Sequence, residues 1–307
     1  MFEACRICGI GATHNIARYV DVSREAEDAM DATARKVMAT YPSGAVLEEN
    51  PRSMGEVWQA IAPILGTDDP YAQTKHHYNE VTLALYDQAM AQVRTADDPA
   101  HLALRISAVG NLIDFGPGIE FDEEKVARLV ADAPNRTFAV DDSADLLDRA
   151  LAASSLVYVA DNCGEVAFDK LLIAELRREN PRLAATYVVR DRPILNDVTL
   201  VDAREAHMDD VAHVITNGDA HSAAGTVLPH TSQEFMDAFL GADIVIAKGQ
   251  GNLETLYRCD RDGVFFMLMA KCPFVARLCG TRQGDLVCME KGRHDLDVEG
   301  AFGQAAV

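Results

Sequence analysis

The change of hydrophobic period near residue 136 constrains the fold of this chain more than any other feature. Residues 13 to 133 hold long segments in which apolar and charged residues interleave with few helix breakers, a pattern typical of helices. After residue 136, short β-branched runs alternate with helical stretches, which predicts βαβ units and a mainly parallel sheet. We therefore expect an α/β protein with a helical domain over residues 1–137. A Rossmann-like, three-layer α/β/α domain should follow over residues 138–307.

The individual elements are predicted from these patterns. The expected helices of the first part cover residues 13–40, 53–65, 70–94, 99–113 and 122–132. The expected strands of the second part cover residues 155–160, 184–190, 213–216, 243–247, 264–270 and 286–289. Apolar runs stay well below the roughly 20 residues that a membrane-spanning helix needs, and the first residues show no signal pattern. These observations favour a cytoplasmic protein.

Charge limits the partners of the chain. The formal net charge is −20, which argues against duplex nucleic acid and against anionic membranes, because both need a basic surface. Residues 248–293 are a local exception, with eight basic and five acidic side chains. We therefore expect a small anionic metabolite as the partner; the oligomeric state is left open.

The seven cysteines predict reduced thiols, because an odd number in a long chain disfavours a disulfide framework. Cys5 and Cys8 form a Cys-x-x-Cys pair, which is only half of a zinc site. The distant cysteines that could complete one are Cys259, Cys272, Cys279 and Cys288, but their spacings do not indicate such a site. Buried thiols without metal are the favoured interpretation, since free cysteine packs as a small apolar residue.

Polar residues follow four of the expected strands at the point where each strand ends. They are Asp161-Asn162-Cys163-Gly164-Glu165, residues 191–197, Asn217-Gly218-Asp219 and Lys248-Gly249-Gln250-Gly251-Asn252. Turn chemistry alone explains any one of these loops, because Asn, Asp and Gly are common turn residues. The presence of four such loops favours a ligand-binding site, because ligands bind at the carboxyl ends of parallel strands.

The residue types in these loops indicate a site for metal and phosphate. Asp161, Asn162 and Asp197 offer oxygen ligands, which hard dications such as Mg²⁺ and Mn²⁺ prefer. Lys248 lies in a Gly-rich turn of the kind that lets backbone N–H groups approach an oxyanion. A dication, a lysine and backbone amides together suit a phosphate ester and can stabilise a phosphoryl-transfer transition state.

The same residues resemble the signature of a known family. The segment from Asp161 to Asp169 is similar to its Asp-Asn-x-Gly-Glu-x-x-x-Asp pattern, and Asn196-Asp197-Val198-Thr199 to its Asn-Asp-x-Thr step. Further similarity lies in Asn217-Gly218, Gly225-Thr226, residues 248–252 and Gly110-Asn111-Leu112-Ile113-Asp114-Phe115-Gly116. The family is the domain-of-unknown-function-89 family, the damage-control phosphatases. The chain resembles its bacterial and archaeal branch over essentially the whole length.

The resemblance implies a metal-dependent phosphatase acting on small phosphometabolites, such as sugar phosphates or damaged cofactor intermediates. It implies that Asp161, Asn162 and Asp197 bind a divalent metal, for which Mn²⁺, Mg²⁺, Co²⁺ and Ni²⁺ are the candidates. Asp161, Asp197 and Lys248 would be catalytic, and Lys248 would also contact phosphate. The other implied substrate- or phosphate-binding residues are Glu165, Asn111, Asn217, Gly218 and Gly249.

Two alternatives remain. An S-adenosylmethionine-dependent carboxyl methyltransferase, an activity also attached to this family, would need a Gly-rich loop after the first strand, where Asp161 and Asn162 stand instead. The second alternative is a non-catalytic phosphometabolite-binding module on the same fold. Within the phosphatase hypothesis, direct attack by a carboxylate and activation of water both fit an aspartate beside a metal.

Overall fold

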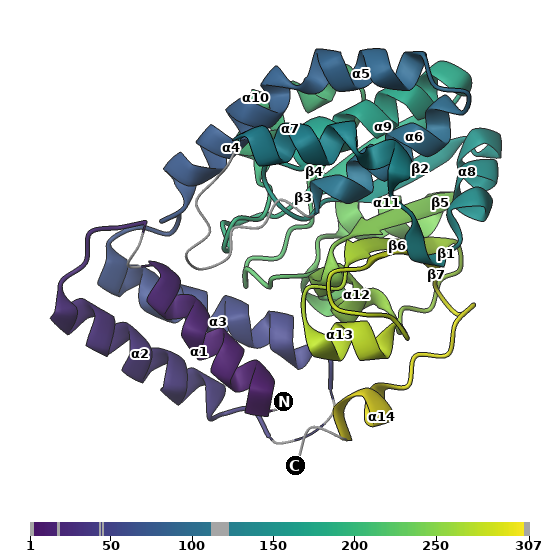
Figure 1. Ribbon diagram of the computed structural model, residues 1–307. Coiled ribbons are helices and arrows are strands. Elements are labelled where there is room, and N and C mark those ends of the chain that lie inside the picture. Colours follow the sequence, from purple (N-terminus) through teal and green to yellow (C-terminus); the bar gives the residue numbers. More distant parts are fainter. Residues whose placement is uncertain (1–2, 17–18, 43, 45, 112–122, 304–307) are drawn as a thin grey trace.

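The computed structural model describes residues 3–16, 19–42, 44, 46–111 and 123–303. Within these residues, seven strands form one sheet in the order β1-β7-β6-β5-β2-β3-β4 (Figure 1). The strands are β1 (Phe138–Asp141), β2 (Ser155–Val159), β3 (Ala184–Val189), β4 (His213–Thr216), β5 (Ile244–Lys248), β6 (Val264–Met269) and β7 (Leu286–Glu290). Neighbouring strands are parallel except β6 and β7, which confirms the predicted mainly parallel sheet.

Helices precede the sheet and alternate with its strands. The helices before β1 are α1 (Glu3–Ile16), α2 (Arg24–Met38), α3 (Glu49–Leu65), α4 (Ala72–Ala84), α5 (Tyr86–Arg94), α6 (Pro99–Gly110) and α7 (Glu123–Ala131). The later ones are α8 (Ser143–Ala152), α9 (Val166–Glu179), α10 (Leu200–Glu205), α11 (Gln233–Gly241), α12 (Gln250–Leu256), α13 (Pro273–Leu278) and α14 (Val298–Gly303). Single 3₁₀ turns occur at Ala133–Asn135, Met208–Asp210 and Leu228–His230.

Two hydrophobic cores lie on opposite faces of the sheet. Leu156 and Tyr158 of β2 belong to the core that α5, α6, α8 and α9 cover. Val157 and Val159 of the same strand belong to the core beneath α11, α12 and α13. Since side chains alternate along a strand, the continuous apolar run of β2 fills both cores. This arrangement confirms the predicted α/β class with helices on both faces of the sheet.

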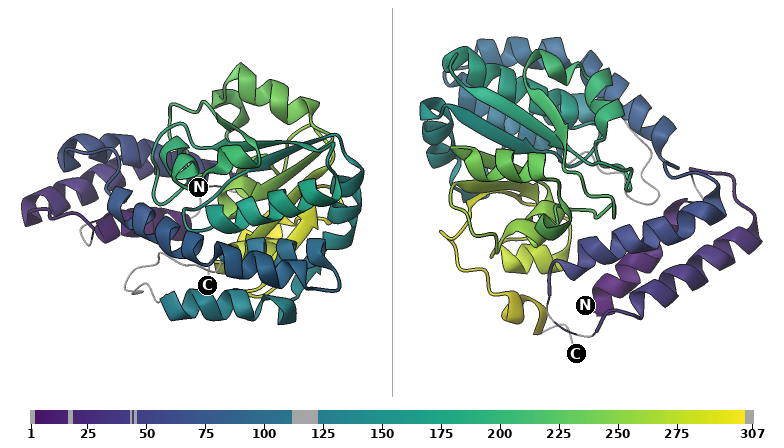
Figure 2. Two further views of the ribbon diagram at one scale, coloured as in Figure 1. Left: turned by 90° about the horizontal axis from the view of Figure 1, so that it is seen from above. Right: turned by 180° about the vertical axis from the view of Figure 1, so that it is seen from behind.

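The first three helices have a core of their own. Met30 of α2 and Trp58 of α3 pack there with Ile16 of α1, and Figure 2 shows these helices projecting beside the α/β body. By contrast, residues of α4 to α7 share the core of the sheet. Helices α1 to α3 and helices α4 to α7 therefore belong to different hydrophobic cores. The domain boundary between residues 137 and 138 stays a prediction.

Local signals account for the differences from the predicted elements. The helix expected over residues 13–40 is divided into α1 and α2, and α2 begins after Ser23, whose Oγ accepts a hydrogen bond from the Ala26 N–H. This is the usual role of a serine N-cap. The strand β1 was not predicted, because a four-residue edge strand carries little periodic signal. The ten-residue helix α8 was not predicted either. Within the described residues, no helix is long and apolar enough to cross a membrane.

Candidate functional site

The site lies where the order of the strands reverses. From β2 the chain proceeds outward to β3 and β4, then returns to β5 on the other side of β2 and continues to β6. The crevice at such a switch point is the usual ligand position in open α/β sheets. Asp161 follows β2 and Gly249 follows β5. A Cβ atom added to Gly249, whose φ is +80°, would lie 2.0 Å from Asp161 Oδ2, so the close approach of the two loops requires glycine.

Backbone pairing joins the loops that follow β2 and β3. Asn162 and Asp197 form an isolated antiparallel bridge. The Cys163 N–H donates to the Asn196 carbonyl at 2.8 Å, and the Val198 N–H donates to the Asp161 carbonyl at 2.9 Å. The three predicted metal-binding residues, Asp161, Asn162 and Asp197, are therefore held side by side.

These three residues line a cavity of about 250 Å³, which we call the polar cavity. Gln250 and Lys271 also line it from the sheet side. The opposite wall comes from α1 and α3 and includes Cys8, Gly9, Asn50 and Met54. Helices α1 and α3 thus cover this side of the α/β crevice.

Asp161 is crowded by negative charge. Its Oδ2 accepts hydrogen bonds from the side-chain amides of Asn111 at 3.0 Å and Asn162 at 2.6 Å. Burial and the charges of Glu165 and Asp197 nevertheless raise the pKa of Asp161 to about 7, although Lys271 and Arg190 act in the opposite direction. A cation in the polar cavity would relieve this repulsion.

Asp197 has one oxygen bound within the protein. Its Oδ2 accepts from Arg190 Nε at 2.7 Å, and Arg190 is itself buried. The Nη1 group of Arg190 donates to the Gly225 carbonyl at 2.8 Å and to Thr226 Oγ1 at 3.1 Å. These bonds fix the Asp197 carboxylate through its Oδ2.

Glu165 and Asn111 hold the side chains of Asp161 and Asn162 in place through hydrogen bonds. Glu165 Oε1 accepts from Asn111 Nδ2 at 2.7 Å and from Asn162 Nδ2 at 2.8 Å. Asn111 Oδ1 in turn accepts the Met269 N–H at 2.8 Å. Both side chains are buried and neither lines the polar cavity, so their geometry indicates positioning rather than the predicted direct contact with substrate. Residues 112–116 of the resembling motif lie outside the described residues.

Lys248 does not line the polar cavity, and its predicted contact with phosphate stays a prediction. Its Nζ is fully buried, 2.8 Å from Glu165 Oε2 and 2.8 Å from Asp169 Oδ1. Burial alone would lower the pKa of Lys248, but the charges of Asp169 and Glu165 raise it well above its usual value. Because side chains alternate along β5, Lys248 faces the same side as Ile246, toward α6 and α9.

Three further predicted phosphate-binding residues serve the backbone instead. Asn217 Oδ1 accepts the N–H groups of Asp191 and Asp219, each at 3.1 Å. The Gly218 backbone packs against Ser232, where an added Cβ would lie 2.4 Å from the serine Cβ. The Gly249 N–H donates to the Met267 carbonyl at 3.0 Å. Asn217, Gly218 and Gly249 do not line the polar cavity, so the geometry does not support a direct contact with phosphate.

Lys271 is the residue that the sequence reasoning missed. It follows β6 by two residues and lines the polar cavity, and its charge lowers the pKa of both Asp161 and Glu165 against the effect of burial. Applying the strand-end rule to β6 as well would have found it. Asn50 and Glu254 were also missed, and no local signal in the sequence marks them as cavity residues.

The donor set fits a hard dication. Asp161, Asn162 and Asp197 supply two carboxylates and one amide carbonyl, all oxygen ligands. Across the described part of the chain, no three His, Cys, Asp or Glu side chains already form a metal-binding cluster. A dication would therefore need the Asn162 amide or water to complete its coordination. The crowding of three carboxylates, those of Asp161, Glu165 and Asp197, is the structural observation that favours a cation here.

Comparison with known proteins identifies the family. A family model described as the damage-control phosphatase ARMT1-like domain matches residues 1–287. The chain belongs to this family. A damage-control phosphatase of Pyrococcus horikoshii is 35% identical over 236 residues, covering 76% of this chain and 78% of the relative. A damage-control phosphatase of Archaeoglobus fulgidus is 32% identical, covering 92% of this chain and 96% of the relative.

A solved structure agrees with this membership. The crystal structure of a DUF89 family protein from Pyrococcus horikoshii superposes with a TM-score of 0.85 at 29% sequence identity. The match covers 95% of this chain and 99% of the solved chain. The family fold therefore extends over both the first three helices and the α/β body.

Proposed function

We propose that this chain is a metal-dependent phosphatase that hydrolyses small phosphomonoesters, such as sugar phosphates or damaged cofactor intermediates. The observation that carries the proposal is the meeting of Asp161, Asp197 and Lys271 in one cavity at the switch point of the sheet. Two carboxylates suit a dication, and a lysine suits a phosphate dianion. The names of the relatives support the same reaction class.

In this proposal, each side chain has a distinct task. Asp161 and Asp197 would hold the dication together with the Asn162 carbonyl oxygen. The bound dication would supply Lewis-acid stabilisation of the phosphoryl oxygens. Lys271 would neutralise the remaining negative charge of the phosphate. Asn111, Glu165 and Arg190 would keep the two aspartates in position through the hydrogen bonds described above.

Turnover with defined metals tests the proposed function. Protein stripped of metal should hydrolyse p-nitrophenyl phosphate only after addition of Mn²⁺, Mg²⁺, Co²⁺ or Ni²⁺, each supplied separately. A panel of phosphometabolites under the most active metal would then identify the substrate class. Calorimetric binding of sugar phosphates without any turnover would support the binding-module alternative instead.

Substitution of Lys271 with alanine should reduce activity without unfolding the protein. We expect kcat/KM to fall by about 10²-fold, the usual effect of removing one electrostatic contact to a transition state. Lys271 is half-buried at the cavity wall, so the free energy of unfolding should change by less than about 1 kcal/mol. Steady-state kinetics and urea unfolding measure the two effects. The exposed Lys36→Ala variant is the matched control, and equal activities for both variants would exclude this role of Lys271.

A further inference from the structure

A second cavity, which we call the apolar cavity, adjoins the polar cavity. It measures about 230 Å³, and the two cavities share Cys8, Asn50, Gln250 and Glu254. Protein interiors leave few voids larger than a water molecule, and an engineered apolar cavity of about 150 Å³ binds benzene. The apolar cavity is therefore large enough for a group somewhat bigger than a benzene ring.

The wall of the apolar cavity is uncharged away from the polar cavity. Ala4 and Cys5 line it from the start of the chain, Leu47 from the segment before α3, and Phe274 and Val275 from α13. Among the described residues of this wall, every side-chain amide and carboxyl belongs to the four shared residues. Burial raises the pKa of Cys5 to about 12, so its thiol stays protonated and packs as a small apolar group.

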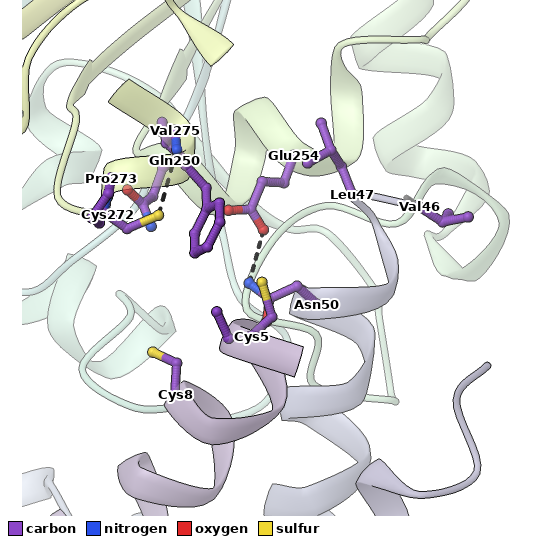
Figure 3. A pocket seen from close by; sticks show the side chains of 12 residues that line it. Cys5, Cys8, Val46, Leu47, Asn50, Gln250, Glu254, Cys272, Pro273 and Val275 are labelled. Atoms are coloured by element: carbon purple, nitrogen blue, oxygen red, sulfur yellow. Dashed lines mark hydrogen bonds between the residues drawn. The ribbon is translucent and has the colours of Figure 1, made fainter. Parts of the chain in front are cut away.

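Glu254 and Asn50 mark the junction of the two cavities, because both side chains line both of them. Asn50 Nδ2 donates to Glu254 Oε2 at 3.0 Å, as Figure 3 shows. Burial raises the pKa of Glu254 to about 7, and the Asn50 hydrogen bond only partly opposes this effect. A molecule that spans both cavities would therefore meet polar side chains at the junction and apolar ones beyond it.

We propose that the apolar cavity receives the alcohol part of the substrate while the phosphate lies in the polar cavity. This inference rests on the proposed phosphatase function and narrows its substrate class. The preferred substrates are phosphomonoesters whose alcohol part has an aliphatic or aromatic body about as large as a substituted benzene ring. Hydrolysis by one water molecule would leave inorganic phosphate in the polar cavity and the free alcohol in the apolar cavity.

The position and chemistry of the apolar cavity favour this occupant over the others. Because the two cavities share four lining residues, a ligand in one lies beside a ligand in the other. Buried water needs two to four polar partners, and the wall beyond the junction offers aliphatic, aromatic and thiol side chains. A bare sugar would leave hydroxyl groups without partners at this wall, which is unfavourable.

Calorimetric binding of alkylphosphonates to the full chain tests this inference without turnover. Phosphonates keep the anionic head group of a phosphomonoester but have no ester bond to hydrolyse. With Mg²⁺ present, hexylphosphonate should bind at least about 50-fold more tightly than methylphosphonate. Each buried methylene contributes about fourfold to affinity, so burial of only three of the five additional methylenes gives this factor.

Ala4→Phe should remove most of this preference. Ala4 is partly buried and lines the apolar cavity but not the polar cavity, so an added ring fills the cavity without replacing a core residue. The affinity for hexylphosphonate should fall at least about 10-fold, while that for methylphosphonate stays within about twofold. Ile7→Phe is the matched control, because Ile7 is exposed on α1 and lines neither cavity.

Phe274→Ala provides a second variant from the opposite wall, and thermal unfolding identifies which variants remain folded. Phe274 is only partly buried, and loss of its ring should also weaken binding of hexylphosphonate more than that of methylphosphonate. Equal affinities for the two phosphonates in the wild-type protein, or no binding of hexylphosphonate, would overturn the inference. So would a preference that Ala4→Phe and Phe274→Ala both leave unchanged. Failure to hydrolyse p-nitrophenyl phosphate with any metal would instead contradict the proposed phosphatase function.

Discussion

Replacing Asp161 with asparagine should lower metal-dependent hydrolysis of p-nitrophenyl phosphate on the order of 1,000-fold. The substitution removes one of the two carboxylates in the proposed metal-binding set and keeps the side-chain volume. A metal ion supplies several kcal/mol of charge stabilisation in the transition state, and a factor of ten in rate corresponds to about 1.36 kcal/mol. Loss of about 4 kcal/mol therefore accounts for the expected decrease.

The same variant should remain folded. The pKa of Asp161 is raised because burial and the neighbouring carboxylates disfavour its negative charge. A neutral asparagine amide at this position therefore removes an unfavourable interaction. Asp209 is an exposed aspartate in a 3₁₀ turn, and Asp209→Asn is the control for the loss of one negative charge. Metal titrations of the rate and thermal unfolding should be measured together. Wild-type rates in folded Asp161→Asn protein would exclude Asp161 from the reaction.

The sequence predicted that the polar loops after the parallel strands would meet at one edge of the sheet. Asp161 and Asp197 were expected to lie at one edge because both follow strands of a parallel sheet, and the structure holds them together through the bridge between Asn162 and Asp197. The position of each loop at the carboxyl edge follows from the topology alone. The opposite wall of the cavity was not predictable in this way, because α1 and α3 reach it through tertiary packing far from their place in the sequence.

Lys248 and Lys271 show where loop position is an insufficient guide. Lys248 is the last residue of β5, so the alternation of the strand decides which face it takes, and it is directed into the core rather than past the strand end. Lys271 lies beyond the end of β6 and is free of that constraint. Strand position thus distinguishes a structural lysine from a cavity lysine, although both lie near Gly-rich or polar turns.

Substitution of Lys248 with methionine should strongly destabilise the protein. The change leaves Glu165 and Asp169 buried with no cation between them, and Asp169 also accepts hydrogen bonds from Tyr158 at 2.6 Å and Tyr187 at 3.0 Å. Removing one partner from a buried ion pair costs about 3–5 kcal/mol. For a chain of this size, each kcal/mol lowers Tm by roughly 2–4 °C, so Tm should fall by about 10 °C.

Urea and thermal unfolding measure this effect, with the exposed Lys36→Met variant as the control for the same chemical change. Adding Asp169→Asn to Lys248→Met should recover part of the lost stability, because it removes one of the carboxylates left unpaired. A purely structural lysine requires this rescue, whereas a phosphate-binding lysine does not. If Lys248→Met instead kept wild-type stability and abolished phosphate hydrolysis, the original prediction of a phosphate contact would be correct and the ion pairs of Lys248 would be of minor importance.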